Sequence, residues 1–317
     1  MKQRFPFWVS PFLLLVRQQG KTGRMARLGR PVLATVGSLA LAGLLGSGCA
    51  GPGASSKAKE SRWLVAVTDH PTQQWQPGKF VWHDLLTPNV SAARDFYGSL
   101  FGWTFEAEGP YTVIRNQGRK IGGMVEVKPT DEQPAQALWL GSLSVADVDE
   151  AVTFLKKEGG TLLSGPEEMA QRGRGALVSD PQGAQLLLLR SATGDPPDRP
   201  AALGDWLWNE IWTGAPADTV AFYQALAGYD SLIEADRYTV LVKNDKWRAG
   251  VRHVFREGFR TRWVPVVRVL DPAAIIEQVP KLGGRVWVRP SDPASNGDTA
   301  LISDPTGAFL VVQRWNW

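Results

Sequence analysis

Hydrophobic and polar residues follow a β-strand pattern over most of the chain, interrupted by short stretches with helical periodicity. Residues 79–86 are apolar and aromatic-rich, as expected for a buried strand, whereas residues 91–101 place Ala, Phe, Tyr and Leu on one helical face. Three further strand-like runs follow at 102–105, 111–115 and 120–127, with Gly, Pro and Asn between them. The pattern predicts a β-α-β-β-β unit.

The same order of elements returns immediately downstream. A strand-like run at 138–145 precedes a helical run at 148–158, which Gly159 and Gly160 end. Three strand-like runs complete this part of the chain, at 160–163, 175–179 and 184–189. The first half of the chain is therefore expected to contain two βαβββ units.

The whole arrangement is then repeated further along the chain. Trp82 and Trp208 lie 126 residues apart, and Trp139 and Trp263 lie 124 residues apart. The hexapeptide Ser-Asp-Pro-Gln-Gly-Ala that starts at Ser179 recurs 124 residues later with Thr in place of Gln. A period of this length indicates a duplicated domain rather than a solenoid repeat, so any function must fit a site that could be built twice.

These landmarks set the expected domain limits. The first domain is expected at 76–191 and the second at 204–317, joined by a Pro- and Asp-rich linker at 192–203. Residues 50–75 begin with a run of Gly, Pro, Ala, Ser and Lys, and are expected to form a flexible tether.

Residues 1–49 resemble a bacterial lipoprotein signal. A short basic region begins at Met25, which we take as the true start, and an apolar stretch leads to Gly-Ser-Gly before Cys49, the only cysteine. The resemblance implies that Cys49 is acylated and that Ala50 after it directs the protein to the outer membrane, facing the periplasm. Because Gly46 stands where Leu is usual, a plain secretory signal with an incidental cysteine is the alternative.

The charge distribution and the absence of several motifs argue against some classes of function. The formal charge is +4, but residues 1–49 carry seven basic and no acidic residues, so the remainder carries −3. A basic surface for nucleic acid is therefore not expected. The sequence contains no P-loop, GxGxxG fingerprint or CxxC pair, which argues against phosphoryl transfer, nicotinamide chemistry and thiol redox.

Several short motifs follow the strands and helices in a fixed order. They are Asn89 to Tyr97, Leu100-Phe-Gly-Trp103, Val145-Ala-Asp147, a helix ending in Gly-Gly, and Asp180-Pro-Gln-Gly183, with Phe222-Tyr223 and Leu226 to Tyr229 in the second copy. Over residues 78–190 and 204–314 this order resembles the vicinal oxygen chelate superfamily, which includes glyoxalases, bleomycin-resistance proteins and extradiol dioxygenases. The resemblance implies an α+β fold of two tandem glyoxalase-like domains. Each would be a pair of βαβββ units forming a curved mixed sheet, with helices on the convex side and a concave cup for a small ligand.

Enzymes of this superfamily hold a divalent metal with His, Gln or Glu on inward-facing strand positions. By register, the resemblance places these positions at Trp82, Leu140 and Leu187 in the first copy and at Trp208, Val264 and Val311 in the second. None of these side chains binds a hard or borderline cation. We therefore expect no metal cofactor, and whether the chain is an enzyme stays open. A divalent metal at shifted positions, held by His253, Glu210 and His83, is the alternative.

Polar residues at equivalent strand positions are further candidates. Asp84 is equivalent to Glu210, and Glu126 to His253. Strand alternation places Asp84 and Glu210 on the concave side. Asp84 with Glu126, and Glu210 with His253, are expected to form one polar pair per cup, as an acid/base pair or a ligand anchor. A salt bridge or a solvated charge at a strand end is the alternative.

The tryptophans are the most distinctive chemical signal, with 14 in the chain. Trp82, Trp139, Trp208 and Trp263 occupy repeated strand positions. Aromatic side chains in place of metal ligands predict a stacking pocket for a planar or apolar molecule. The alternative is that they fill the cups as core, and one cup could be filled while the other is open.

Three hypotheses follow. The leading one is an envelope-anchored protein that binds or sequesters a small aromatic or apolar molecule without a metal. It would meet the membrane only through its lipid anchor, and self-association into a homodimer is compatible with it. The second is a metal-dependent lyase, isomerase or hydroxylase-like enzyme. The third is a structural platform whose cups are both filled.

Overall fold

The computed structural model describes residues 63–128, 137–235, 238–254, 259–292, 295 and 297–316. The expected signal segment with Cys49 and the first part of the expected tether lie outside these ranges. Within the ranges, none of the helices has the length and apolar character needed to span a membrane.

The first domain contains the two predicted βαβββ units. Its first unit consists of β1 (Phe80–Thr87), α3 (Val90–Phe101), β2 (Thr104–Glu108), β3 (Tyr111–Asn116) and β4 (Arg119–Glu126). Its second unit consists of β5 (Leu138–Ser144), α4 (Val148–Lys157), β6 (Thr161–Glu168), the 3-10 turn η1 (Ala170–Arg172), β7 (Gly173–Ser179) and β8 (Gln185–Ser191).

The second domain repeats this order. Its first unit consists of β9 (Trp206–Thr213), α5 (Pro216–Ala227), β10 (Asp230–Ala235), β11 (Tyr238–Lys243) and β12 (Lys246–His253). Its second unit consists of β13 (Arg262–Val269), α6 (Pro272–Gln278), the 3-10 turn η2 (Val279–Leu282), β14 (Arg285–Val288), β15 (Thr299–Ser303) and β16 (Phe309–Arg314).

Each domain forms one eight-stranded sheet in which its two units pair side by side. The strand order is β2-β3-β4-β1-β5-β8-β7-β6 in the first sheet and β10-β11-β12-β9-β13-β16-β15-β14 in the second. In the first sheet β1 pairs parallel with β4 and antiparallel with β5, and β9 makes the equivalent pairs with β12 and β13. The units therefore pair within a domain, and the predicted α+β architecture is confirmed.

Side-chain caps and a glycine mark the ends of the helices. Asn89 caps α3 by accepting a hydrogen bond from the Ala92 backbone N–H, and Asp147 caps α4 in the same way. Gly102 ends α3 with a φ of 69°, a left-handed conformation that glycine adopts without steric cost.

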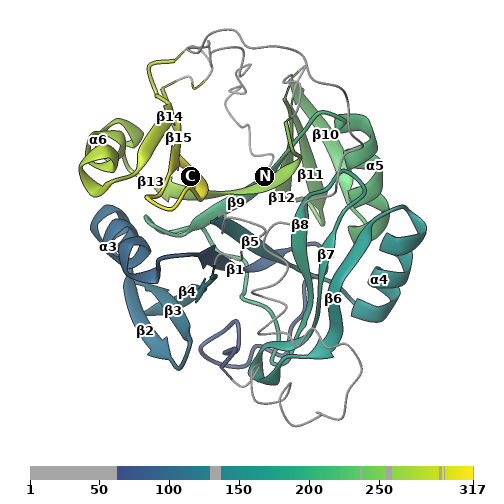
Figure 1. Cartoon of the computed structure of the whole chain (residues 1–317). Coiled ribbons are helices and arrows are strands. Elements are labelled where there is room, and N and C mark those ends of the chain that lie inside the picture. The colour runs from purple at the N-terminus through teal and green to yellow at the C-terminus, as the bar shows by residue number, and fades with distance from the viewer. Residues whose placement is uncertain are drawn as a thin grey trace, which may run out of the picture.

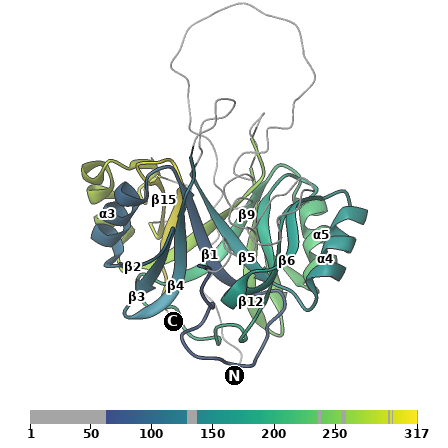
Figure 2. The ribbon, with the colours of Figure 1, turned by 60° about the horizontal axis from the view of Figure 1, so that its bottom comes forward.

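The two sheets lie back to back, with the helices packed along both flanks. Figure 1 shows α3 beside α6 on one side and α4 beside α5 on the other, and Figure 2 shows β1, β5 and β9 between these helix pairs. Each helix pair covers a core built from both domains: Phe96 shares one core with Ile276, and Leu155 shares the other with Phe222. The concave faces consequently point in opposite directions (Figure 1).

The concave faces carry two smaller cores, which we call the first cup and the second cup. The first cup contains buried Trp82, Leu86, Tyr111, Leu140 and Leu187 among its residues. The second cup contains Trp212, Val264, Val266, Leu301 and Val311, with half-buried Trp208 packed against them.

The C-terminal part of the expected tether is not flexible chain. Leu64 and Val67 are each only 2% exposed and belong to the core of the first cup, with Trp63 and Val65 packed against it. We call residues 63–69 the strap. The apolar side chains of this stretch bury it against the cup. The first domain therefore begins before residue 76, the boundary expected from the sequence.

Candidate functional site

A fully paired polar cluster lies at the floor of the first cup. Asp84 accepts hydrogen bonds from Trp82 Nε1 at 3.0 Å and from the Tyr111 hydroxyl. Its other carboxylate oxygen lies 3.2 Å from Arg172 Nη1, and the guanidinium also stacks over the Trp82 ring at 4.6 Å. Because Arg172 and Asp84 are 1% and 2% exposed, this is a buried ion pair.

The equivalent carboxylate in the second cup is paired differently. Arg252 binds both oxygens of Glu210, with Nε at 2.9 Å and Nη2 at 2.8 Å. Trp212 Nε1 and the Tyr238 hydroxyl also donate to Glu210. Burial alone would raise the pKa of Glu210, but Arg252 outweighs it and holds the pKa below its usual value. The cation here comes from a neighbouring strand, whereas Arg172 comes from a loop.

Trp82 donates a hydrogen bond to the buried carboxylate of its cup, whereas Trp208 does not. Trp212 donates to Glu210, and Trp208 Nε1 has no hydrogen-bond partner within the described residues. The Trp208 ring stacks on Trp247, with centroids 5.7 Å apart and planes 16° apart, and lies 6.5 Å from Trp315. These indoles form an aromatic wall around Trp208, which packs against the core of the second cup.

A cavity of about 570 Å³ adjoins this wall where β1 and β9 begin. We call it the aromatic cavity. Its lining includes the four indoles Trp206, Trp208, Trp247 and Trp315, and also Phe80 and His83. Its size lies within the range of pockets that hold drug-sized ligands.

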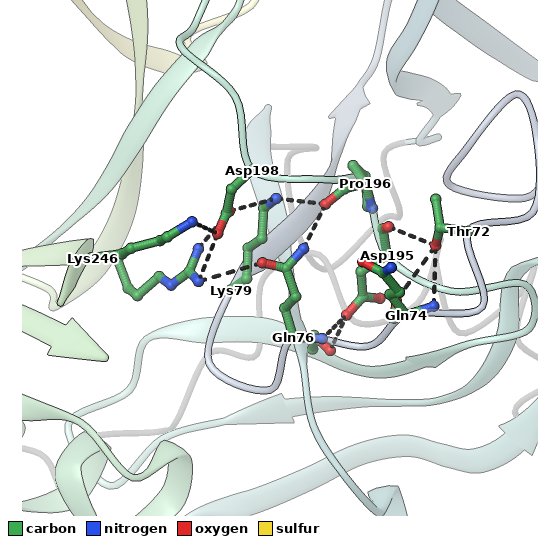
Figure 3. Close-up of polar contacts among 10 residues, drawn as sticks. Thr72, Gln74, Gln76, Lys79, Asp195, Pro196, Asp198 and Lys246 are labelled. Carbon is green, nitrogen blue, oxygen red and sulfur yellow. Dashed lines mark hydrogen bonds and ion pairs between the residues drawn. The ribbon is translucent and has the colours of Figure 1, made fainter. Parts of the chain in front are cut away.

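The linker between the domains closes one side of the aromatic cavity and is held by polar contacts with both domains. Asp198 forms ion pairs with Lys79 at 3.0 Å, Lys246 at 2.8 Å and Arg248 at 2.7 Å. Figure 3 shows Asp198 meeting Lys79 and Lys246, and shows Asp195 meeting Gln76. Burial opposes ionisation of Asp198, but the three cations hold its pKa well below the usual range.

The prediction that Trp139 and Trp263 line the cups is wrong. Trp139 is paired with Leu85 and Trp263 with Ile211, and residues paired across strands share a face of the sheet. Leu85 and Ile211 belong to the cores on the helix side. Both indoles therefore lie on the convex faces.

The expected polar pairs Asp84–Glu126 and Glu210–His253 are not formed. The parallel register sets Asp84 beside Gly123 and Glu210 beside Gly250, so Glu126 and His253 lie three residues further on, where alternation turns them to the other face. Glu126 is exposed and His253 is half-buried. Buried Arg172 pairs with Asp84 and half-buried Arg252 pairs with Glu210 instead.

His83 lies on the convex face between the domains, as alternation predicts. His83 Nε2 is 2.8 Å from Asn209 Oδ1, the equivalent position of the other copy, and the imidazole lies 4.2 Å from the Trp206 ring. Burial is the main cause that lowers the pKa of His83 to about 4. His83 therefore lies on the opposite face of the sheets from Glu210, and the alternative metal set of His253, Glu210 and His83 is not assembled.

The donor set also does not fit a metal at the positions implied by the superfamily. Trp82, Leu140 and Leu187 lie in the first cup, and Val264 and Val311 in the second, as expected from register. No group of three or more His, Cys, Asp or Glu residues converges anywhere in the described part of the chain. Oxygen and nitrogen donors for a divalent ion are thus not gathered in either cup.

Two equivalent hydrogen bonds link the helices of each domain to the other domain. The Tyr97 hydroxyl of α3 donates to Asp304 at 3.2 Å, and the Tyr223 hydroxyl of α5 donates to Asp180 at 2.9 Å. Trp139 and Trp263, each through Nε1, donate to these tyrosines. The repeated Asp-Pro motifs and the repeated tyrosines were visible in the sequence, but nothing in it showed that they meet across the domain boundary.

We expect Asp180→Asn to gain stability relative to the wild type as the pH rises from about 4 to 7. Burial is the main cause that raises the pKa of Asp180 from 3.8 to about 6, so the folded state holds a proton that the unfolded state releases. Wild-type stability therefore falls as the pH rises through this window, by about 3 kcal/mol at most. Denaturant unfolding at several pH values measures the difference.

His83→Asn should show the opposite pH dependence and serves as the comparison. The folded pKa of about 4 lies below the usual 6.5, so wild-type stability is present above about pH 6.5 and is lost as the pH falls towards 4. The variant should therefore gain relative stability on acidification. Parallel curves for the two variants would contradict the assigned protonation states.

The strand order defines a class of fold: two eight-stranded sheets back to back, each with one concave face. Residues 79–188 match the family model described as glyoxalase/bleomycin resistance protein/dioxygenase superfamily. The chain thus carries a domain of this superfamily, and the second half repeats its fold. The resemblance stated from the sequence is confirmed.

Similar proteins share most of this chain's length. "Putative glyoxylase CFP32" of Mycobacterium tuberculosis is 28% identical over 251 residues, which cover 76% of this chain and 96% of that protein. "Anthracycline biosynthesis protein DauV" of Streptomyces sp. strain C5 is 28% identical over 264 residues, covering 76% and 94%.

Solved structures show the same fold at lower identity. The 2,2',3-trihydroxybiphenyl 1,2-dioxygenase from Sphingomonas wittichii has a TM-score of 0.52 at 12% identity, over 76% of this chain and 91% of its own. The Mn(II)-bound glyoxalase from Novosphingobium aromaticivorans has a TM-score of 0.50 at 13% identity, over 75% and 82%.

Proposed function

We propose that this protein binds a small planar aromatic molecule in the aromatic cavity and performs no metal chemistry there. The observation that carries the proposal is the stacked pair Trp208–Trp247 on the wall of a cavity of about 570 Å³. Indole faces attract a second planar ring by stacking as well as by burial of apolar area.

The ion pairs around the aromatic cavity favour recognition by shape and stacking rather than by charge. Of the five cations that line the cavity, Lys79, Lys246 and Arg248 are engaged by Asp198. An anionic ligand would have to compete with this carboxylate for the same cations. A largely apolar, planar ligand meets no such competition.

One relative supports the same ligand class. The Streptomyces protein that is 28% identical is named for anthracycline biosynthesis, and anthracyclines carry a planar fused-ring system. The cavity of this chain offers the stacking surface that such a ring system requires. We therefore propose fused-ring aromatic compounds as the ligands.

The proposal is tested by titrating an anthracycline with the purified protein. Stacking against indole should quench the fluorescence of the compound in a saturable, one-to-one manner, and the tryptophan emission of the protein should fall with the same midpoint. Quenching that rises linearly without saturation would reject a defined site.

Adding a divalent metal to the same purified protein distinguishes a metal-free binding protein from a metal-dependent enzyme. With no convergent donor set in the described residues, adding Mn²⁺ or Zn²⁺ should leave the unfolding midpoint unchanged. A stoichiometric ion that stabilises the fold by a few kcal/mol at saturation would instead favour the metal-dependent enzyme.

We propose further that the protein is held at the outer membrane, on the periplasmic side, by acyl groups on Cys49. Cys49→Ser should then lose incorporation of labelled palmitate and move from the membrane fraction to the soluble fraction. Ala50→Asp is the matched variant, because it should keep the label but shift the protein to the inner membrane. A Cys49→Ser protein that stays in the membrane fraction would reject the anchor.

A further inference from the structure

The strap occupies the first cup in the manner of a bound peptide. Leu64 and Val67 enter the core that contains Trp82 and Tyr111. The backbone carbonyl of Val65, between them, accepts a hydrogen bond of 2.8 Å from Arg172 Nε. One polar contact flanked by apolar side chains is the pattern of a peptide segment bound in a hydrophobic pocket.

Within the polar floor beneath the strap, one donor has no acceptor other than the strap. The two Nη atoms of Arg172 are bonded to Asp84 and Tyr111, which leaves Nε for the strap. The second cup has no equivalent vacancy, because Arg252 uses both Nε and Nη2 on Glu210. The first cup therefore keeps one buried donor that needs an acceptor from outside the sheet.

The strap is held by buried side chains and by one hydrogen bond from Arg172 rather than by backbone pairing. Within the described residues, the backbone N–H groups of 63–71 make no hydrogen bonds to other backbone groups, and the first such bonds run from Thr72 and Gln73 to Thr193 O. On the exposed side, Asp69 accepts from Arg115 Nη1 at 2.9 Å and from the Lys120 backbone N–H at 3.2 Å. Opening the strap thus breaks no β-sheet pairing, so it costs less than unfolding the domain.

We propose that the first cup is a second, gated binding site for apolar peptide segments, and that the strap is its internal competitor. A peptide whose carbonyl replaces that of Val65 on Arg172, with apolar side chains in place of Leu64 and Val67, would bind when the strap opens. This site is separate from the aromatic cavity, so it does not depend on the function proposed above.

Two glycines provide a matched pair of variants. A Cβ added to Gly109 would lie 2.6 Å from the Trp63 ring, so Gly109→Ala must shift this ring at the first residue of the strap. Gly118 has a similarly positive φ, +78° against +60°, but an added Cβ there meets nothing within 4 Å. Gly118→Ala carries the same kind of backbone strain and leaves the strap in place.

Hydrogen exchange on the whole protein tests the gate. Amides of the strap should exchange at least tenfold faster than those of β4 in the wild type. Gly109→Ala should raise strap exchange about tenfold further relative to β4, whereas Gly118→Ala should leave the ratio unchanged. If strap and β4 exchange together in the wild type and in Gly109→Ala, the strap is a fixed part of the core and the proposal fails.

Binding in trans tests the site itself. The probe is the acetylated, amidated pentapeptide Trp-Leu-Val-Ala-Val, the sequence of residues 63–67. It should bind Gly109→Ala at least tenfold more tightly than Gly118→Ala or the wild type. No difference between the variants would overturn the proposal. Equal affinity for acetyl-leucine methylamide would also overturn it, because a small amide rather than a peptide would then be the ligand.

Discussion

Arg172→Met is expected to lower the free energy of unfolding by about 3–5 kcal/mol, because it leaves the Asp84 carboxylate buried without its cation. The substitution also removes the cation–π contact with Trp82 and the bond to the Val65 carbonyl. Chemical denaturation monitored by tryptophan fluorescence measures the change. The loss should appear in the transition of the first domain if the two domains unfold separately.

Arg174→Met is the matched control for this variant. Arg174 lies two residues away and pairs with Asp149 at 2.6 Å, but both side chains are substantially exposed. An exposed ion pair contributes about 0–1 kcal/mol, so this variant should unfold nearly as the wild type does. Adding Asp84→Leu to Arg172→Met should recover much of the lost stability, since no unpaired charge then remains. Equal effects of Arg172→Met and Arg174→Met would contradict the buried ion pair.

Trp247→Ala is expected to weaken binding of a planar aromatic ligand by about 10–100-fold. The substitution removes one of the two stacked rings of the wall, and losing such an aromatic anchor costs about 1.4–3 kcal/mol. Titration of the anthracycline fluorescence gives the dissociation constants. Trp247→Phe should bind with intermediate affinity, because it keeps a smaller aromatic face.

Trp287→Ala is the control within the same domain. Trp287 is half-buried, packs against Phe309 and donates to Ser303 Oγ at 3.0 Å, but it does not line the aromatic cavity. Its removal should leave ligand affinity within about twofold while changing stability. A loss of affinity equal to that of Trp247→Ala would show that the ligand binds elsewhere in the second cup.

For Trp82 and Trp208, the sequence predicted the face of the sheet on which each lies but not the partners of each side chain. Both were expected on the concave faces, and both are there. Their different roles arise from residues that no local pattern connects to them. Arg172 reaches Trp82 from a turn 90 positions along the chain, and Trp212 takes over the hydrogen bond that Trp208 would otherwise make.

The errors at Trp139, Trp263, Glu126 and His253 have one physical origin. Strand alternation shows which residues share a face within one strand, but not which face of one strand continues into the next. That relation depends on the pairing register, such as Asp84 beside Gly123. Register is decided when strands distant in sequence pair, and a shift of one residue turns every side chain to the other face.

The sequence by itself determined the duplication, the βαβββ order, the helix that follows Asn89, and the apolar residues at the positions where the superfamily holds a metal. These features follow from local periodicity and residue chemistry. Only the tertiary structure decided that the strap fills the first cup, that arginines pair with Asp84 and Glu210, and that helices of one domain bond to loops of the other. Such contacts depend on burial and on the back-to-back packing of the sheets, which join residues far apart in the chain.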